Sequence, residues 1–259
     1  MLFEEERKRK IVDYIQSHGR ALVPELANRF QVSESTVRRD LRELEEAKQL
    51  RRTHGGAVLL QQDSVEPSFV EKEDRYRRQK ERIAQEALSF IDEEDTIFLD
   101  SGTTTYFMAK HLRNFQKLTV VTNSNMVAQE LNQMKHLDLL LTGGTLRYET
   151  QAMVGPIADR AIGSIRVDKL FLAINGLDPD GGLTTPNLTE AETKRRMIQS
   201  AKQVILVMDH SKFGKVSFAK VAELTDIHHC IVDDAISEQA VRTMEAEGIK
   251  VTVARRLEL

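Results

Sequence analysis

The sequence contains a single cysteine, Cys230, and no stretch of apolar residues long enough to span a membrane. One cysteine excludes an internal disulfide, which fits a reducing cytoplasm. A membrane span needs roughly 20 consecutive apolar residues, so we predict no membrane partner. The first ten residues, MLFEEERKRK, are charged and precede no apolar core. They therefore predict no signal peptide, and we expect a cytoplasmic protein.

Two common nucleotide-binding motifs are also missing, because neither G-x-x-x-x-G-K-S/T nor a G-x-G-x-x-G after a predicted strand occurs. His228, His229 and Cys230 are adjacent, but Cys230 opens an apolar stretch and no second cluster lies nearby. We therefore predict neither a metal site nor a cofactor. The neighbours Asp209, His210 and Ser211 are triad residue types, but adjacent residues do not share a face, so a catalytic triad is not expected.

The composition indicates a globular protein with a charged surface. The chain has 259 residues, of which 41% are hydrophobic and 30% charged, enough to bury a core in one or two domains. Residues 1–60 carry 12 Lys and Arg against 10 Asp and Glu, and the remainder carries 25 against 30. A mildly basic N-terminal part on an acidic body favours localised contact with DNA over coating of nucleic acid.

Residues 1–58 have the apolar spacing of three helices followed by a hairpin. Ile11 and Ile15 predict a first helix from about Glu5 to Ser17, which Gly19 would end. A second short helix is expected at residues 23–30. Ser33 is an N-cap residue type and would start a third helix. The buried stripe of this third helix is predicted to be Val37, Leu41 and Leu44.

The opposite face of the third helix carries Ser35, Arg39 and Arg42, with Thr36 and Arg38 on its flanks. Such a face suits a helix lying in the major groove, where hydroxyls and guanidinium groups contact base edges and phosphates. The acidic residues nearby leave a salt-bridged surface helix as the alternative. The basic hairpin at residues 50–58 would form a wing and favours DNA binding. The predicted DNA contacts are Ser33, Ser35, Thr36, Arg38, Arg39, Arg42, Arg51, Arg52 and His54.

These residues resemble the winged helix-turn-helix of the DeoR family of bacterial transcription regulators. The similarity lies in Thr-Val-Arg-Arg-Asp-Leu at residues 36–41 and in Arg-Thr-His-Gly-Gly-Ala at residues 52–57, and it covers the whole head. The resemblance implies operator DNA as a partner.

Residues 59–78 mix polar and charged side chains and are interpreted as a linker, with a second domain at residues 79–259. Short apolar stretches alternate there with helical patterns, which favours a parallel sheet covered on both faces, a Rossmann-like α/β fold. Seven strands are expected, at residues 96–99, 118–121, 137–141, 169–174, 204–207, 230–232 and 249–253.

Polar clusters follow five of these strands, where ligands of open α/β sheets bind. Ser101 to Thr105 offer hydroxyls, Gly102 would allow a close backbone approach, and the loop feeds a predicted helix N-terminus. Thr189-Glu-Ala-Glu192 fits a capping box at the start of a helix. We predict a small anionic ligand. Its contacts would be Asp100, Ser101, Gly102, Thr103, Thr104, Thr122, Asn123, Gly143, Gly144, Arg147, Lys194 and Lys212. Lys194, Arg147 and Lys212 would supply counter-charges, and Asp100 and Asn123 would contact sugar hydroxyls.

The second domain resembles the sensor domain of the same family, which is similar to ribose-5-phosphate isomerase, glucosamine-6-phosphate deaminase and the CoA-transferases. The similar segments include residues 100–104, 122–124, 143–147, 182–185, 190–194 and 209–212. The resemblance implies that the domain senses a phosphorylated sugar. The presence of the DNA-binding head favours sensing over catalysis, so we predict that the protein is not an enzyme.

The sequence thus predicts a repressor of a sugar-catabolism operon that a phosphorylated sugar releases from its operator. A dimer or tetramer is expected because such operators are usually repeated half-sites. One alternative is a sugar-phosphate isomerase or deaminase with a DNA-binding appendage, with Asp100 as its general base. Another is a sensor of a nucleotide or of an unphosphorylated sugar. Whether the effector is an inducer or a corepressor stays open.

Overall fold

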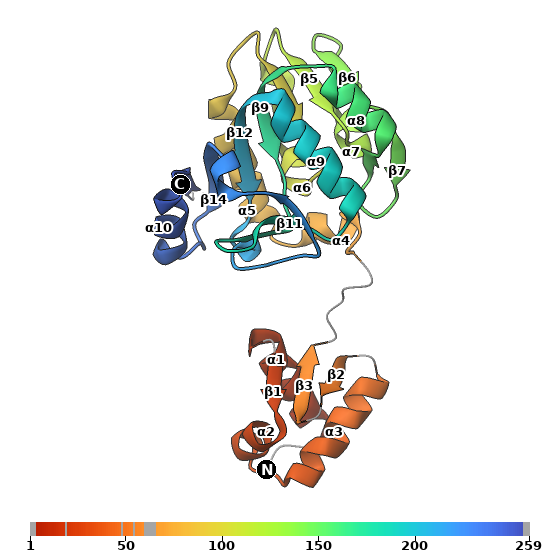
Figure 1. Ribbon diagram of the computed structural model, residues 1–259, viewed down its shortest axis with the longest axis vertical. Coiled ribbons are helices and arrows are strands. Elements are labelled where there is room, and N and C mark those ends of the chain that lie inside the picture. The colour runs from red at the N-terminus through yellow and green to blue at the C-terminus, as the bar shows by residue number, and fades with distance from the viewer. Residues whose placement is uncertain (1–3, 19, 48, 54, 60–65, 256–259) are drawn as a thin grey trace. The chain divides into compact units, whose positions relative to one another are not determined.

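The computed structural model describes residues 4–18, 20–47, 49–53, 55–59 and 66–255. The chain divides into two compact units, which we call the head (residues 1–66) and the body (residues 67–259). Each has its own hydrophobic core. Figure 1 shows the helices and strands of both units.

The head is a winged helix-turn-helix, as predicted. Its helices are α1 (Glu4–His18), α2 (Val23–Phe30) and α3 (Glu34–Glu46), and its strands are β1 (Arg20–Leu22), β2 (Leu50–Thr53) and β3 (Gly56–Leu59). The strands pair antiparallel in the order β1-β3-β2. The strand β1 was not anticipated. It packs so closely on β3 that a Cβ at Gly56 would lie 2.0 Å from the carbonyl oxygen of Ala21. The predicted helix-ending Gly19 lies outside the described residues.

The start and the buried stripe of α3 also agree with prediction. Ser33 is the N-cap, and its hydroxyl accepts a hydrogen bond from the Thr36 amide at 3.2 Å. Val37, Leu41 and Leu44 are buried against α1 and α2. The helix therefore presents its remaining faces, including the predicted recognition residues, away from the core of the head.

A buried ion pair ties α1 to α3. Asp40 has no exposed surface, and it accepts two hydrogen bonds from the guanidinium of Arg7, at 2.6 and 3.0 Å. A buried carboxylate is tolerated only when it is paired and hydrogen-bonded. The alternative of a salt-bridged surface helix included Asp40 among its solvated acidic residues, and its burial corrects this. Asp40 fixes the recognition helix to the rest of the head.

The body is built on a seven-stranded parallel sheet with strand order β15-β14-β12-β9-β4-β5-β6. All seven predicted strands occur, with small shifts at their ends. Their bounds are β4 (Thr96–Leu99), β5 (Thr119–Thr122), β6 (Asp138–Leu141), β9 (Val167–Leu172), β12 (Ala201–Met208), β14 (His229–Asp233) and β15 (Lys250–Ala254). The predicted α/β class is therefore confirmed.

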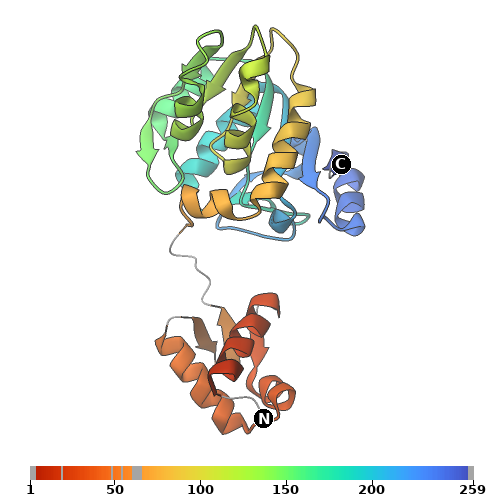
Figure 2. The same ribbon diagram turned by 180° about the vertical axis from the view of Figure 1, so that it is seen from behind.

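Helices cover both faces of the sheet, because alternate strand residues point to opposite faces. One face packs on α5 (Arg77–Ala87), α6 (Thr103–Ala109) and α7 (Asn125–Leu131). The other packs on α8 (Pro156–Gly163), α9 (Leu188–Ser200) and α10 (Glu238–Ala246). Figure 1 looks onto the side of α8 and α9, and Figure 2 onto the opposite side. Within the described part of the chain, no helix is long and apolar enough to cross a membrane.

Smaller elements that we did not predict complete the body. A hairpin pairs β7 (Thr145–Arg147) with β8 (Ala152–Val154), and a second small sheet has the order β10-β11-β13. Its strands are β10 (Gly176–Asp178), β11 (Gly182–Thr185) and β13 (Ala219–Ala222). The described residues of the body also form short 3-10 helices: η1 (Leu88–Phe90), η2 (Leu112–Asn114), η3 (His210–Lys212) and η4 (Leu224–Asp226).

The predicted linker at residues 59–78 was too long. The body begins at residue 67, α4 (Phe69–Asp74) lies within the predicted linker, and α5 starts at Arg77. Phe69 is 4% exposed and its ring meets that of Tyr106 edge-on at 5.5 Å. Because most residues of α4 are charged, the sequence did not indicate that one aromatic side chain is buried. Phe69 anchors this helix to α6.

We predict that Asp40→Asn destabilises the head by about 3 kcal/mol, because removing one partner of a buried ion pair leaves the other charge uncompensated. The exposed pair of Glu34 and Arg38, whose side chains are 49% and 57% exposed, provides the control. Glu34→Gln should cost under about 1 kcal/mol. Hydrogen exchange of α1 and α3 peptides in the full chain measures both. Equal protection in the two variants would contradict the anchoring role of Asp40.

Candidate DNA-binding surface and effector site

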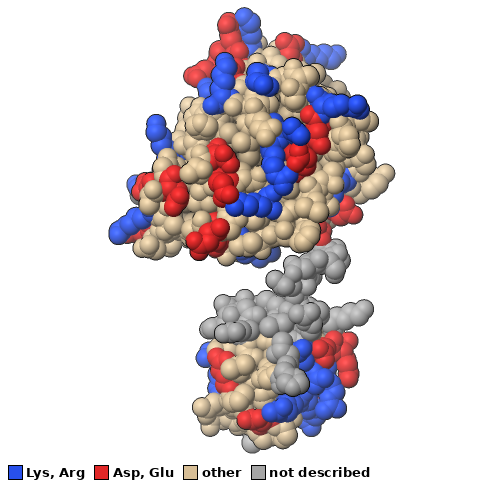
Figure 3. All heavy atoms as spheres, viewed as in Figure 1, with Lys and Arg blue, Asp and Glu red and all other residues tan. Residues whose placement is uncertain are grey.

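The exposed face of α3 carries the predicted recognition residues. Ser35, Arg39 and Arg42 are exposed, and Thr36 is partly so. The Ser33 hydroxyl lies 2.8 Å from those of Ser35 and Thr36, so the start of the helix holds a connected hydroxyl group. Figure 3 shows basic side chains gathered on the head over α3, with acidic ones beside them. Arg38 is held by Glu34 at 2.8 Å, which leaves its guanidinium beside this face.

The predicted wing is the β2–β3 hairpin. Arg52 donates from both its backbone amide and its Nε to Glu45 at the end of α3, each at 2.8 Å. These hydrogen bonds, the backbone one first, lower the pKa of Glu45. Arg52 therefore orients the wing against the recognition helix. The side chain of Arg51 and the whole of His54 lie outside the described residues, and their predicted contacts stay predictions.

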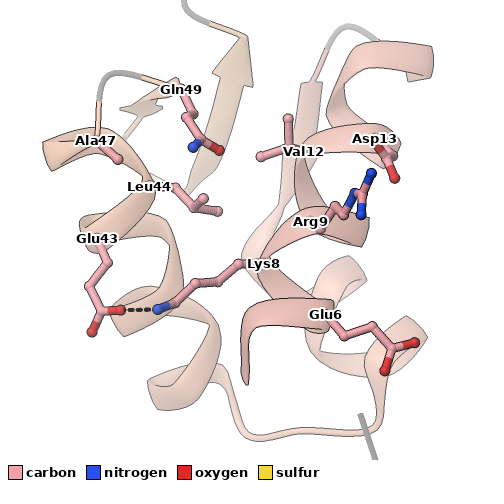
Figure 4. A pocket seen from close by; sticks show the side chains of 9 residues that line it. All are labelled: Glu6, Lys8, Arg9, Val12, Asp13, Glu43, Leu44, Ala47 and Gln49. Carbon is pink, nitrogen blue, oxygen red and sulfur yellow. Dashed lines mark ion pairs between the residues drawn. The ribbon is translucent and has the colours of Figure 1, made fainter. Parts of the chain in front are cut away.

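An open groove of about 620 Å³ lies between α1 and the C-terminal end of α3 (Figure 4). Lys8 crosses it to pair with Glu43, and charged groups of both signs line its walls. Its lining residues are Glu6, Lys8, Arg9, Val12, Asp13, Glu43, Leu44, Ala47 and Gln49. A mixture of both signs does not select a charged ligand, so we assign no binding role to it.

In the body, the carboxyl ends of five strands bring the predicted effector residues to one edge of the sheet. Asp100 follows β4 and is fully buried. Its carboxylate accepts hydrogen bonds from the amides of Ser101 and Ala173, at 2.7 and 3.0 Å, and from Lys194 Nζ at 2.5 Å. Lys194 is 4% exposed and also donates to the Ala173 carbonyl at 3.0 Å. Lys194 thus neutralises Asp100 and is not a spare counter-charge.

The loop after Asp100 has two kinds of residue. Gly102 is needed for packing, because a Cβ there would lie 2.4 Å from the Ala173 Cβ. The Thr105 hydroxyl donates within the loop, to the carbonyl oxygen of Gly102 at 2.9 Å. In contrast, the hydroxyls of Thr103 and Thr104 have no hydrogen-bond partner among the described residues, although both residues are over nine-tenths buried. These two hydroxyls remain available to a ligand.

The predicted residues after β5 and β6 have structural roles that the sequence did not show. Thr122 is buried, and its hydroxyl donates to the Leu99 carbonyl at 2.7 Å and accepts from the Ser124 amide at 3.0 Å. Gly143 has a φ of 66°, which favours glycine. Gly144 has a φ of 119°, and a Cβ there would lie 2.7 Å from the Val154 carbonyl oxygen. These three residues shape the turns, and their ligand contacts stay predictions.

Arg147, like Lys194, already faces a carboxylate and is not a spare counter-charge for a ligand. Its Nη1 lies 2.9 Å from Oε2 of Glu190, a residue in the first turn of α9 that is only 3% exposed. The predicted capping box at residues 189–192 is wrong, because Asn187 is the N-cap and accepts from the Glu190 amide at 3.1 Å. The Glu190 side chain points instead to Arg147. The prediction used Thr189 and Glu192 for the cap and gave Glu190, between them, no partner of its own.

Lys212 lies on η3, a short helix that two carboxylates hold in place. The backbone amide of His210 donates to Asp233 at 2.7 Å, and the His210 Nδ1 lies 2.9 Å from the same carboxylate. Asp209 caps η3 through the Ser211 amide at 3.1 Å. These contacts hold Lys212 in place, with its Nζ 3.9 Å from Asp209.

Four further cations act electrostatically with Lys212. We call the five residues the cation cluster: Lys72, Arg75, Lys80, Lys212 and Lys215. Burial lowers the pKa of Lys80 to about 8, although the residue keeps a hydrogen bond to the Lys72 carbonyl. Burial followed by neighbouring charges also lowers the pKa values of Lys212 and Lys215. Asp209 is the carboxylate that opposes all three shifts.

Sequence reasoning found Lys212 but missed the other four members. Lys72 and Arg75 fell in the predicted linker, and Lys80 and Lys215 were not among the predicted ligand contacts. A charged residue on the buried side of α5 was the available signal, since Lys80 lies three positions before the buried Ile83.

The motifs that we set aside have other partners. The Val204 amide donates to His228 Nδ1 at 3.1 Å, and His229 Nε2 lies 2.8 Å from the Thr252 hydroxyl. Cys230 is buried, which raises the pKa of its thiol to about 12. In the described part of the chain, no three potential ligand side chains form a metal-binding group.

Comparison with known proteins agrees with this two-part organisation. Residues 7–63 match the DeoR-like helix-turn-helix domain, and residues 75–234 match the DeoR C-terminal sensor domain. The uncharacterized transcriptional regulator YulB of Bacillus subtilis is 38% identical over 95% of this chain and 95% of its own. The glycerol-3-phosphate regulon repressor of Haemophilus influenzae is 33% identical over 95% of this chain and 96% of its own.

Among solved structures, ribose 5-phosphate isomerase A of Methanocaldococcus jannaschii aligns over 53% of this chain and 55% of its own, with 14% identity and a TM-score of 0.40. So distant a likeness carries no argument about function. The two family matches and the nearly full-length similarity to YulB are specific enough to show the family. This chain belongs to the DeoR family of helix-turn-helix transcription regulators.

Proposed function

We propose that this protein represses a sugar-catabolism operon and leaves its operator when a phosphorylated sugar binds the body. The cation cluster is the observation that carries the choice of effector. The name of the Haemophilus influenzae relative, a glycerol-3-phosphate regulon repressor, supports the same class of regulon. The exposed face of α3 would read the operator, and the wing would contact its backbone.

The cation cluster is suited to a phosphate monoester. Burial has already lowered the pKa values of Lys80 and Lys212, so their charged forms lack solvation at neutral pH. A bound dianion would supply the missing negative charge through charge-assisted hydrogen bonds. The unpartnered hydroxyls of Thr103 and Thr104 would add neutral donors. Lys194 and Arg147, which already face carboxylates, would take no part in holding the phosphate.

The position of α4 suggests how the effector would act. Lys72 lies on α4 and Arg75 follows it, so two members of the cluster belong to the first segment of the body after residue 66. A phosphate held by these residues would alter the segment through which the head is attached. To release DNA, the effector must bind more tightly to the arrangement of the protein that cannot bind DNA than to the arrangement that can. We also propose a homodimer or homotetramer, because repeated half-sites require repeated heads.

An isomerase or deaminase is a weaker proposal. Asp100, its expected general base, is fully buried and its carboxylate accepts hydrogen bonds from two backbone amides and Lys194. A general base must reach the proton that it removes. Asp100 instead fits a structural role.

For the head, we predict that Arg39→Ala weakens specific operator binding by about 1–3 kcal/mol, the usual worth of a bidentate base contact. Arg9→Ala removes an exposed arginine of α1 and serves as the control, with little expected change. Fluorescence anisotropy with a duplex that the wild-type protein selects from random sequence measures both. Equal affinities of Arg39→Ala and wild type would remove Arg39 from the base contacts.

For the body, we predict that Lys212→Met weakens binding of a recognised sugar phosphate by about 1.5–3 kcal/mol, through loss of a charge-assisted contact. Lys202→Met is the control, because Lys202 is exposed and pairs with Asp168 at the other edge of the sheet. Isothermal titration calorimetry against a panel of sugar phosphates and their unphosphorylated parents measures the change. Unchanged affinity in Lys212→Met, or equal binding of the parent sugars, would contradict the phosphate site.

We predict that effector affinity depends on pH because of the lowered pKa of Lys80. A bound dianion raises the pKa of Lys80 from about 8, so the complex holds a proton that the unbound protein loses above that pH. Affinity should therefore fall about tenfold between pH 7 and 9. A phosphate monoester is already dianionic there, because its second pKa is about 6. Lys80→Met should flatten this profile, and a steep profile retained in Lys80→Met would exclude Lys80 as its cause.

A further inference from the structure

The two outermost strands of the parallel sheet, β15 and β6, differ in what they expose to solvent. Outermost strands usually avoid pairing with another chain because they carry charged residues, above all Lys, or are covered by another element. β15 follows this rule, since it begins with the exposed Lys250 and exposes no large apolar side chain. β6 has one charge, Asp138, and after it Leu140 and Leu141 are 46% and 43% exposed. β6 therefore has the composition of a strand that a further strand covers.

Among the described residues, the backbone of β6 is hydrogen-bonded on one side only. The amides of Asp138 and Thr142 donate to carbonyl oxygens at the two ends of β5, each at 3.1 Å, so the even-numbered positions face β5. Backbone groups of successive strand residues point in opposite directions, so the amides and carbonyls of Leu139 and Leu141 face away from β5. No described strand pairs with them. The outer side of β6 thus offers two donors and two acceptors.

Two copies of β6 satisfy all of these groups in the antiparallel register centred on Leu140. With a two-fold axis there, Leu139 of each copy lies opposite Leu141 of the other, and such opposed residues exchange two hydrogen bonds. An axis through Leu139 would instead pair Leu141 with Leu137, whose amide already donates within its own chain. An axis through Leu141 would pair Leu139 with Gly143, whose φ of 66° is not extended. Hydrogen bonding therefore selects Leu140 as the centre.

The same register brings together apolar side chains on both faces of the sheet. Leu139 packs on the face covered by α5, α6 and α7, so Leu140 points to the opposite face, on the side of α8 (Figure 1). Ile157 of α8 is 59% exposed and lies beside the end of β6, because a Cβ at Gly143 would be 3.9 Å from its Cγ2. Leu140 would contact its own copy at the axis, and the exposed Leu141 would pack against Leu139 of the other copy. Pairing would therefore cover the exposed leucines of β6.

The charge on β6 is also compatible with a second copy. With the axis at Leu140, Asp138 of one copy lies opposite Thr142 of the other, so the carboxylates do not face each other. Like charges directly opposite would destabilise a strand pair. A surface that matches itself in hydrogen bonds, apolar side chains and charge is isologous, the arrangement of a two-fold dimer. The partner that fits β6 is thus an identical chain.

We propose that β6 is a dimerisation surface, at which two copies of this chain pair antiparallel about a two-fold axis at Leu140 and join their sheets. This inference rests on the proposed function for the need of repeated heads, and it adds the surface that would bring two chains together. Lys212 follows β12, which β9, β4 and β5 separate from β6. The dimerisation surface therefore does not use the cation cluster.

Sedimentation velocity of the full chain tests this surface. The wild type should be a dimer at micromolar concentration. Leu140→Lys should raise its dissociation constant about 100-fold, because two like charges would meet at the axis. Leu188→Lys is the matched control, since Leu188 is 60% exposed at the start of α9, and it should leave the dimer unchanged. If the wild type is a tetramer, Leu140→Lys should reduce it to dimers through loss of this one surface.

Opposite charges at the same position test where the axis lies. Leu140→Lys and Leu140→Glu should each dissociate, and their equimolar mixture should recover the association, because residue 140 faces residue 140 of the other copy in this register. Leu141→Pro removes an outward amide without removing a hydrogen bond to β5, and should weaken the dimer about tenfold. Circular dichroism of each variant verifies that it is folded, and Leu141→Pro tests the surface even if a charged variant fails to fold.

Two results would overturn the dimerisation surface and leave the proposed oligomer intact. One is an unchanged dissociation constant in the folded Leu140→Lys or Leu141→Pro variant. The other is a mixture of the folded Leu140→Lys and Leu140→Glu variants that does not associate. A wild-type chain that is monomeric at micromolar concentration contradicts the repeated heads of the proposed function, and the dimerisation surface with them.

Discussion

The ion pair between Asp100 and Lys194 is the interaction on which the effector region depends. It joins β4 to α9, and through Ala173 it also holds the end of β9. A buried pair of this kind stays stable only when further hydrogen bonds satisfy both partners, and the amides of Ser101 and Ala173 provide them. The strand ends and the first turns of α9 are thereby fixed before any ligand arrives. Preorganisation of this kind reduces the entropy lost on binding.

Unbalanced charge is concentrated elsewhere on the same edge. Five cations gather there, and burial lowers the pKa values of three of them, Lys80, Lys212 and Lys215. The body thus has neutral ion pairs where they hold the fold together. Its excess positive charge lies where a bound anion can neutralise it. The head follows the same division, with Asp40 and Arg7 paired in its interior and Arg39 and Arg42 on its surface.

The sequence predicted elements whose signal is periodic and local. All seven parallel strands, the three helices of the head and the cap at Ser33 follow from apolar spacing and residue type. The prediction failed where a charged residue is buried by a distant partner, as with Asp40, Glu190 and Lys80. Their partners lie far along the chain or on segments interpreted as linker, and residue type alone says nothing of burial. Several predicted ligand contacts, Lys194 foremost, have structural partners for the same reason.

The most direct test of the account measures operator affinity with and without a sugar phosphate that binds the body, in the wild-type protein and in Lys212→Met. Binding at the cation cluster should weaken operator affinity of the wild type, and Lys212→Met should need a far higher effector concentration for the same effect. An operator affinity that does not respond to a bound sugar phosphate would contradict the claim that the body controls the head. A tighter operator complex would reverse the sign and make the effector a corepressor.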